Sequence, residues 1–187
     1  MPASKIVIPN KLIVVATSIY TTHSLLTFMK GLIFMNYAKI IKYDTGNWDG
    51  INTTIFFSGC NFHCPGCFNK EAQDFNFGKP FTKEVEDLFI SYAKSEHVDG
   101  VCILGGEPFQ QDLDILLNFV KRIKREVQKP VHMWTGYLFE ELLKDYKKFD
   151  ILKYVDTIVD GHFIESEKDL NLKYRGSKNQ RVIYLYR

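Results

Sequence analysis

From residue 35 onward, short apolar runs alternate along the chain with longer stretches in which apolar and polar residues are mixed. The apolar runs are rich in β-branched and aromatic residues, which is typical of buried strands. They predict strands at Thr53–Ser58, Val101–Leu104, Val131–Trp134 and Val155–Val159, with Arg181–Tyr186 as a further candidate.

The mixed stretches between these runs predict helices. Thr82 is a plausible N-cap for a helix whose apolar residues follow the spacing i, i+3, i+4, i+7. That apolar face consists of Val85, Leu88, Phe89 and Tyr92. A second helical stripe consists of Leu113, Leu116, Leu117, Val120, Ile123 and Val127, and Phe139–Leu143 is also helical in pattern. Strands that alternate with helices predict an α/β fold with parallel strands and crossover helices.

The first 34 residues differ in character from the rest. Their two apolar runs, Leu12–Tyr20 and Leu25–Phe34, are both shorter than the ~18–20 residues of a membrane span. No convincing signal-peptide cleavage site follows Lys11. We interpret residues 1–34 as an N-terminal extension outside the core, which is either upstream of the true start or a loosely attached arm. A membrane anchor is the less favoured interpretation. The predicted catalytic domain is therefore residues 35–187.

Composition narrows the class of protein. The chain has 187 residues, of which 45% are hydrophobic and 25% charged, as in a single soluble domain. A net charge of +2 is too small to indicate a nucleic-acid partner, and no membrane partner is expected. Three of the four cysteines fall within one eight-residue stretch, which favours a metal in a reducing, cytoplasmic setting over a disulfide framework.

Small or polar residues follow each of the four predicted strands. These clusters are Ser58-Gly59-Cys60, Gly105-Gly106-Glu107-Pro108, Thr135-Gly136 and Asp160-Gly161. Parallel strands with crossover helices bring their carboxyl ends to one edge, where α/β proteins bind ligands. Glycines at that edge allow a cofactor to approach the backbone. We therefore expect one common site built from four loops.

The cysteine loop has the spacing C-x3-C-x2-C, at Cys60, Cys64 and Cys67. Three thiolates so close together can hold three corners of a 4Fe-4S cluster and leave the fourth iron open to a small molecule with amine and carboxylate groups. The alternative is zinc, with a fourth ligand from His63 or Cys102. Zinc is less favoured because no second Cys or His pair is present, His63 lies inside the tight loop, and Cys102 has the surroundings of a small core residue.

The cysteine motif after the first predicted strand, together with Gly105-Gly106-Glu107-Pro108 after a later one, resembles the radical S-adenosylmethionine (SAM) superfamily. In that family the open iron of a 4Fe-4S cluster binds the amino and carboxylate groups of SAM, and the glycine-rich motif contacts the SAM amino group. The resemblance implies that Gly105, Gly106 and Glu107 orient this amino group. The alternative for Glu107 is a loop carboxylate in solvent.

Other positions follow from the same resemblance. Gly66 stands where many members carry an aromatic residue, so backbone contacts around Gly66, Cys67 and Phe68 are expected to border the adenine instead of a stacked ring. Thr135 and Asp160 are further candidates for SAM binding. Trp134 and Tyr137 are expected in the core. The segment Arg175–Arg181 docks a partner, faces the SAM carboxylate or is an exposed tail, and the residues alone do not decide among these roles.

A narrower resemblance covers most of residues 35–187. It is carried by Met35-Asn36-Tyr37, Cys64-Pro65-Gly66-Cys67-Phe68-Asn69, Trp134-Thr135-Gly136-Tyr137, Val159-Asp160-Gly161 and Gly176-Ser177-Lys178-Asn179-Gln180-Arg181. In this order they resemble the anaerobic ribonucleoside-triphosphate reductase activating proteins.

This resemblance implies an incomplete β/α barrel of the radical SAM type and a small enzyme. With an external one-electron reductant such as flavodoxin, such an enzyme cleaves SAM to a 5′-deoxyadenosyl radical and forms a glycyl radical on its partner, the anaerobic reductase. Two rival interpretations are another radical SAM enzyme, such as a pyruvate formate-lyase activator, and a zinc-binding adaptor without catalysis.

Overall fold

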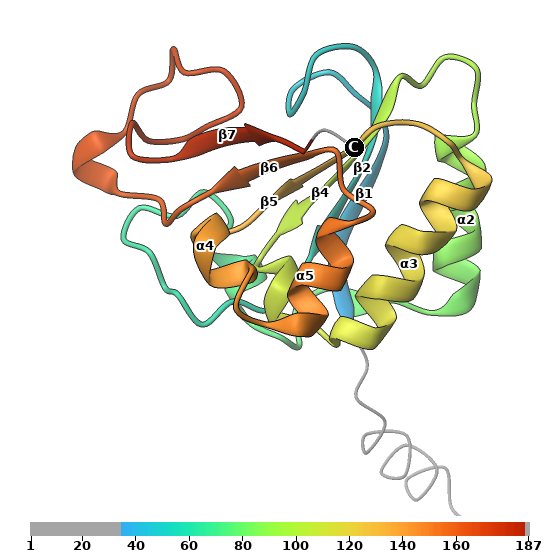
Figure 1. Cartoon of the computed structure of the whole chain (residues 1–187), viewed down its shortest axis with the longest axis horizontal. Coiled ribbons are helices and arrows are strands. Elements are labelled where there is room, and N and C mark those ends of the chain that lie inside the picture. Colours follow the sequence, from blue (N-terminus) through green and yellow to red (C-terminus); the bar gives the residue numbers. More distant parts are fainter. Residues whose placement is uncertain (1–34, 186–187) are drawn as a thin grey trace, which may run out of the picture. The chain divides into compact units, whose positions relative to one another are not determined.

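The computed structural model describes residues 35–185, so the predicted extension at residues 1–34 lies outside the described residues. One seven-stranded sheet runs through this part of the chain in the order β3-β1-β2-β4-β5-β6-β7 (Figure 1). The strands are β1 Asn36–Asp44, β2 Asn52–Phe57, β3 Lys79–Pro80, β4 Gly100–Gly105, β5 Val131–Trp134, β6 Thr157–Asp160 and β7 Arg181–Tyr184.

The four central strands are parallel, as the sequence predicts. β2 pairs with β4 from Asn52↔Gly100 to Phe57↔Gly105, and β5 and β6 continue the parallel ladder. β1 and β3 were not predicted, because β1 alternates lysines with apolar residues and lacks a continuous apolar run. The candidate strand at the carboxyl end forms as β7 and pairs antiparallel with β6. The result is a mixed α/β fold whose mostly parallel sheet stays open, with β3 and β7 at its two ends.

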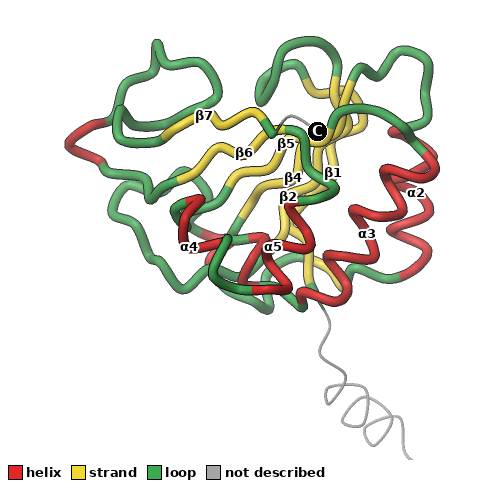
Figure 2. The backbone as a smooth tube through the Cα atoms, in the orientation of Figure 1, coloured by secondary structure: helices red, strands yellow, loops and turns green. Residues whose placement is uncertain are grey.

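The helices lie on one face of the sheet (Figure 2). They are α2 Lys83–Ala93, α3 Leu113–Glu126, α4 Phe139–Leu142 and α5 Tyr146–Leu152, with 3-10 turns at Glu71–Gln73, Pro108–Gln110 and Glu165–Glu167. The order β2-β4-β5-β6 advances in one direction, so right-handed crossovers place every connecting helix on the same side. No helix within residues 35–185 is both long enough and apolar enough to cross a membrane.

The N-cap of α2 is confirmed, but its predicted apolar face is partly wrong. The Thr82 hydroxyl accepts a hydrogen bond from the Val85 amide at 3.4 Å. Leu88, however, is 45% exposed, while Ile90 is buried beside Phe89. The buried side of α2 is therefore rotated from the simple i, i+3, i+4 stripe. Such a rotation depends on the neighbouring helix and strands, and the helix sequence alone does not contain it.

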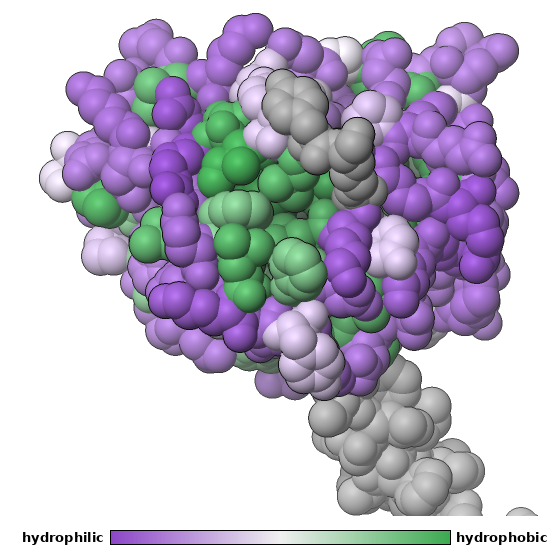
Figure 3. Space-filling view, in the orientation of Figure 1, coloured by the Kyte–Doolittle hydropathy of each residue, from purple (hydrophilic) through white to green (hydrophobic). Residues whose placement is uncertain are grey.

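The main core lies between the helices and the sheet, and Phe119 of α3 is at its centre. Its ring meets those of Phe57, Phe81 and Phe89 edge-on, with centroids 5.0–6.2 Å apart. Such edge-to-face contacts add to the stabilisation from area burial. Figure 3 shows further apolar residues at the surface between β7 and helices α4 and α5, bordered by polar side chains.

The opposite face of the sheet carries a second, smaller core. Phe56, Cys102 and Leu104 are buried there, with Trp48 and Trp134 packed against them. Cys102 is fully buried, which confirms its interpretation as a core residue. Loops instead of helices cover this face, and the functional site lies at its edge.

We expect Phe119→Ala to lower the free energy of unfolding by about 3–5 kcal/mol, because it removes a fully buried ring and leaves a cavity. Leu88→Ala is the control, because Leu88 also lies on a helix of this layer but its side chain is half exposed to solvent. Its expected loss is below about 1 kcal/mol. Urea unfolding followed by circular dichroism measures both. Equal losses would contradict the packing described here.

Candidate functional site

The carboxyl ends of the four parallel strands surround a pocket of about 430 Å³. It lies where the sequence predicts a common site. Most of the predicted residues line it: Cys60, Cys64, Cys67, Phe68, Gly105, Gly106, Glu107 and Thr135. The pocket is also lined by Trp134, from the second face of the sheet, and by Gly161 and part of the segment 172–180, from the chain after β6.

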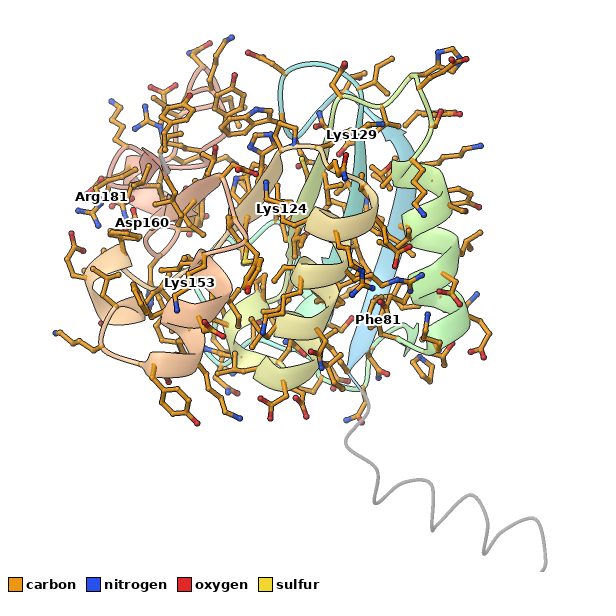
Figure 4. The ribbon with its side chains drawn as sticks, turned by 45° about the vertical axis from the view of Figure 1, so that its right-hand side comes forward. Phe81, Lys124, Lys129, Lys153, Asp160 and Arg181 are labelled. Carbon is orange, nitrogen blue, oxygen red and sulfur yellow. The ribbon has the colours of Figure 1, made fainter. Side chains whose placement is uncertain are left out.

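Two predicted residues do not line the pocket. Gly66 lies in the turn closed by the Cys67 amide, which donates to the Cys64 carbonyl at 3.2 Å. Asp160 is fully buried behind Gly161. Its carboxylate accepts from the Phe139 amide at 2.7 Å and from Arg181 Nε at 3.0 Å, as the adjacent labels in Figure 4 illustrate. Its hydrogen bonds therefore join β6 to α4 and β7.

The cysteine loop is tied down at its start and leaves its three thiols free. The amides of Gly59 and Cys60 donate to the carbonyls of Ala72 and Gln73 at 2.7 and 3.0 Å. Cys60, Cys64 and Cys67 are half-buried and form no disulfide. In residues 35–185 no three His, Cys, Asp or Glu side chains already converge as metal ligands would. The thiols thus share one pocket without yet pointing to a common centre.

Burial controls the protonation of two of these thiols. Desolvation is the main cause that raises the pKa of Cys60 to about 11, with smaller contributions from the nearby Glu107 and Cys64. Desolvation also raises the pKa of Cys64. Both groups are therefore neutral thiols at pH 7. A metal that binds them must displace their protons, which is the usual route by which cysteine becomes a thiolate ligand.

The glycine loop after β4 packs directly against the cysteine loop. A Cβ atom on Gly105 would lie 2.3 Å from the Phe57 carbonyl oxygen, and one on Gly106 would lie 2.5 Å from that of Gly59. The amides of Gly106 and Glu107 donate to those same two carbonyls at 2.7 and 2.8 Å. The two glycines are therefore required for contact between the loops, in addition to any approach of a ligand.

Glu107 is buried at 1% exposure, so the alternative of a carboxylate in solvent is wrong. Its Oε1 accepts from the Phe109 amide at 3.0 Å and from the Thr135 hydroxyl at 2.8 Å. Its Oε2 accepts from the Gly136 amide at 2.7 Å. Burial raises the pKa of Glu107 to about 7 despite these bonds. The side chain fastens the loop after β4 to the loop after β5.

The segment 174–181 forms one wall of the site. Gln180 Oε1 accepts from the amides of Gly176 and Ser177 at 2.8 and 3.2 Å, and Gln180 Nε2 donates to the Gly161 carbonyl at 3.0 Å. Arg175, Gly176 and Gln180 all line the pocket. This part of the chain is therefore folded against the strand ends.

Two aromatic residues fix the same wall from the other side. The Tyr174 ring stacks on Trp48 with centroids 3.7 Å apart, and the Tyr174 carbonyl accepts from Trp134 Nε1 at 2.6 Å. Trp134 packs against the smaller core as expected, and its half-buried side chain also lines the pocket. Tyr137 packs against the main core as expected. The sequence gives no signal that would place the side chain of Trp134, and not that of Tyr137, at the pocket.

Comparison with known proteins agrees with this arrangement. The family described as a 4Fe-4S single cluster domain matches residues 47–183. The anaerobic ribonucleoside-triphosphate reductase-activating protein of Pasteurella multocida is 38% identical over 81% of this chain and 98% of its own length. The protein of the same name from Escherichia coli K12 is 37% identical over 81% of this chain and 99% of its own, and that of phage T4 is 36% identical over 79% and 93%. The chain belongs to the family of anaerobic ribonucleoside-triphosphate reductase-activating proteins.

Membership of this family confirms the resemblance seen in the sequence, and with it the prediction of a radical SAM activating enzyme with an iron–sulfur cluster. The matched region begins before the cysteine loop and ends within β7, so it contains every residue that lines the pocket except Gly46. A cluster is accordingly favoured over zinc.

We expect Glu107→Gln to lower the free energy of unfolding by about 1–3 kcal/mol, because the amide can no longer accept all three hydrogen bonds and places a donor against a donor. Thermal or urea unfolding of the iron-free protein measures the loss. Glu141→Gln is the matched control: Glu141 accepts one bond, from the Leu138 amide at 2.8 Å, at an exposed position. A neutral effect at both positions would show that Glu107 does not hold the loops together.

Proposed function

We propose that this chain activates an anaerobic ribonucleoside-triphosphate reductase by forming a glycyl radical on it. The observation that supports this most directly is the junction of the cysteine loop with the glycine loop at one pocket, in a chain of the activating-protein family. When bound, a reduced 4Fe-4S cluster supplies the electron that splits SAM into methionine and a 5′-deoxyadenosyl radical, which removes a hydrogen atom from a glycine Cα of the partner.

Cys60, Cys64 and Cys67 are the proposed cluster ligands. All three line the pocket, and their side chains would turn to a common centre to hold the cluster. Cys102 is buried on the sheet away from the pocket. Among the described residues that line the pocket, no histidine and no fourth cysteine occurs. Three protein ligands leave one iron open for SAM.

The rest of the pocket fits SAM in size and character. A volume of about 430 Å³ lies within the range of pockets for small ligands. We propose that Gly105 and Gly106 orient the SAM amino group and that Glu107 acts by holding their loop in place. Backbone groups of Cys67 and Phe68 border the adenine, Gly66 shapes the turn before them, and Thr135 contributes through its bond to Glu107. Asp160 has a positioning role, because its carboxylate is occupied by Arg181 and Phe139.

The fold supports the same proposal. The open sheet, with helices on one face and the pocket at the carboxyl edge, is compatible with the incomplete β/α barrel of radical SAM enzymes. We propose that residues 35–187 form the catalytic domain and act in the reducing cytoplasm. The electron is expected from an external one-electron donor such as flavodoxin.

The ligand assignment predicts different effects for two cysteines. Cys64→Ala should lose the brown colour and most of the bound iron after anaerobic reconstitution. Cys102→Ala should keep both, with only the stability loss of a small core cavity. Iron per chain and the visible spectrum measure the difference. Equal iron loss in the two variants would revive a metal site with four cysteines.

The proposed reaction predicts a radical on a protein glycine. The reduced enzyme, SAM and the cognate reductase, mixed without oxygen, should give an organic doublet by electron paramagnetic resonance. The doublet should collapse toward a singlet when the reductase carries glycine deuterated at Cα. Cys64→Ala serves as the control without a cluster. Rapid SAM cleavage without any protein radical would refute activation of the reductase and would point to a small-molecule substrate.

A further inference from the structure

Arg175 is the single lysine or arginine among the described residues that line the pocket. The other charged residue there is Glu107, whose oxygens are all bonded inside the protein. The pocket wall therefore offers one cationic group to a ligand. The inference that follows rests on the proposed function, since it concerns how SAM is held in this pocket.

The guanidinium of Arg175 is only partly satisfied by the protein. Its Nη1 donates to the Gln180 carbonyl at 2.9 Å. Its Nε is buried and has no hydrogen-bond partner in the described residues. An N–H group removed from water without an acceptor costs free energy, and more so when it belongs to a charged side chain. A ligand acceptor would remove that cost if the side chain turned to bring Nε to the pocket.

The backbone on both sides of Arg175 is held in place. Before it, Tyr174 has a left-handed φ of 64°, a ring stacked on Trp48 and a carbonyl bonded to Trp134. After it, the Gly176 amide donates to Gln180 Oε1. The guanidinium thus starts from a fixed point on the wall, so little order has to be imposed when a ligand binds.

SAM has one anionic group, its carboxylate, while its sulfonium is cationic and its adenine and ribose are neutral. We propose that Arg175, which lines the pocket, binds the SAM carboxylate through its guanidinium. A guanidinium matches a carboxylate in geometry as well as in charge, because two of its parallel N–H groups can meet the two oxygens. The role left open by the sequence for the segment Arg175–Arg181 is thereby assigned to SAM instead of to the partner.

The test compares SAM with decarboxylated SAM, which lacks only the carboxylate, by equilibrium dialysis against the reconstituted full chain before any reductant is added. Arg175→Gln should weaken SAM binding about 10- to 100-fold and leave the affinity for decarboxylated SAM unchanged. Arg175→Lys should recover part of the loss, because it keeps the charge but not the paired donors. Lys178→Gln, at an exposed position in the same segment, should bind both ligands as the wild type does.

Wild type and Arg175→Gln are compared for each ligand separately. Decarboxylated SAM cannot form an iron–carboxylate bond in either protein, so the difference between the two proteins reports on Arg175 and not on the open iron. Equal weakening for both ligands would overturn the inference and make Arg175 a structural residue. Unchanged SAM binding together with weaker binding of the reductase would also overturn it and assign Arg175 to partner docking. A wild-type cluster protein that does not bind SAM would instead refute the proposed function, which distinguishes the two failures.

Discussion

The buried carboxylate of Glu107 is the contact on which the rest of the pocket depends. It accepts two backbone amides and one hydroxyl, and these come from its own loop and from the loop after β5. Its own amide and that of Gly106 attach the glycine loop to the cysteine loop. A carboxylate without these donors would be too costly to bury. The pKa raised to about 7 reflects a desolvation that these donors only partly offset, so the side chain joins two loops at an electrostatic cost, and the backbone amide of the same residue joins the third.

The other half of the pocket is held by contacts between residues far apart in sequence. Trp48 lies between the rings of His132 and Tyr174, at centroid distances of 4.1 and 3.7 Å. Gln180 joins the last wall to the strand end at Gly161. These contacts give Arg175 its place, although it follows β6 and its 3-10 turn in an irregular stretch. The second face of the sheet is thus closed by aromatic stacking and amide hydrogen bonds in place of helices.

Strand and helix positions could be predicted because they depend on local patterns. The four central strands and the cap at Thr82 follow from apolar runs and from the preference of a hydroxyl for a helix start. The strand β1 and the rotated buried face of α2 could not be predicted, because neighbouring elements decide which of their residues are buried. The same distinction applies at the site. The cysteine and glycine motifs identify two walls, whereas the pairing of Asp160 with Arg181 joins positions 21 residues apart and follows from no local pattern.

Two carboxylates at this edge of the sheet show that an acidic residue at a strand end need not be available to bind a ligand. Glu107 and Asp160 both follow or end a parallel strand, and both are almost completely buried. Asp160 is matched by the guanidinium of Arg181, and Glu107 is matched by dipoles of amides and a hydroxyl. Each is fully occupied in joining loops, so neither is free to make a salt bridge with a ligand. The pocket-lining groups left for a ligand are the three thiols, which form no disulfide, and the guanidinium of Arg175. The chemistry of the pocket must therefore be carried by these groups and by backbone atoms, on a frame that the two buried carboxylates keep in shape.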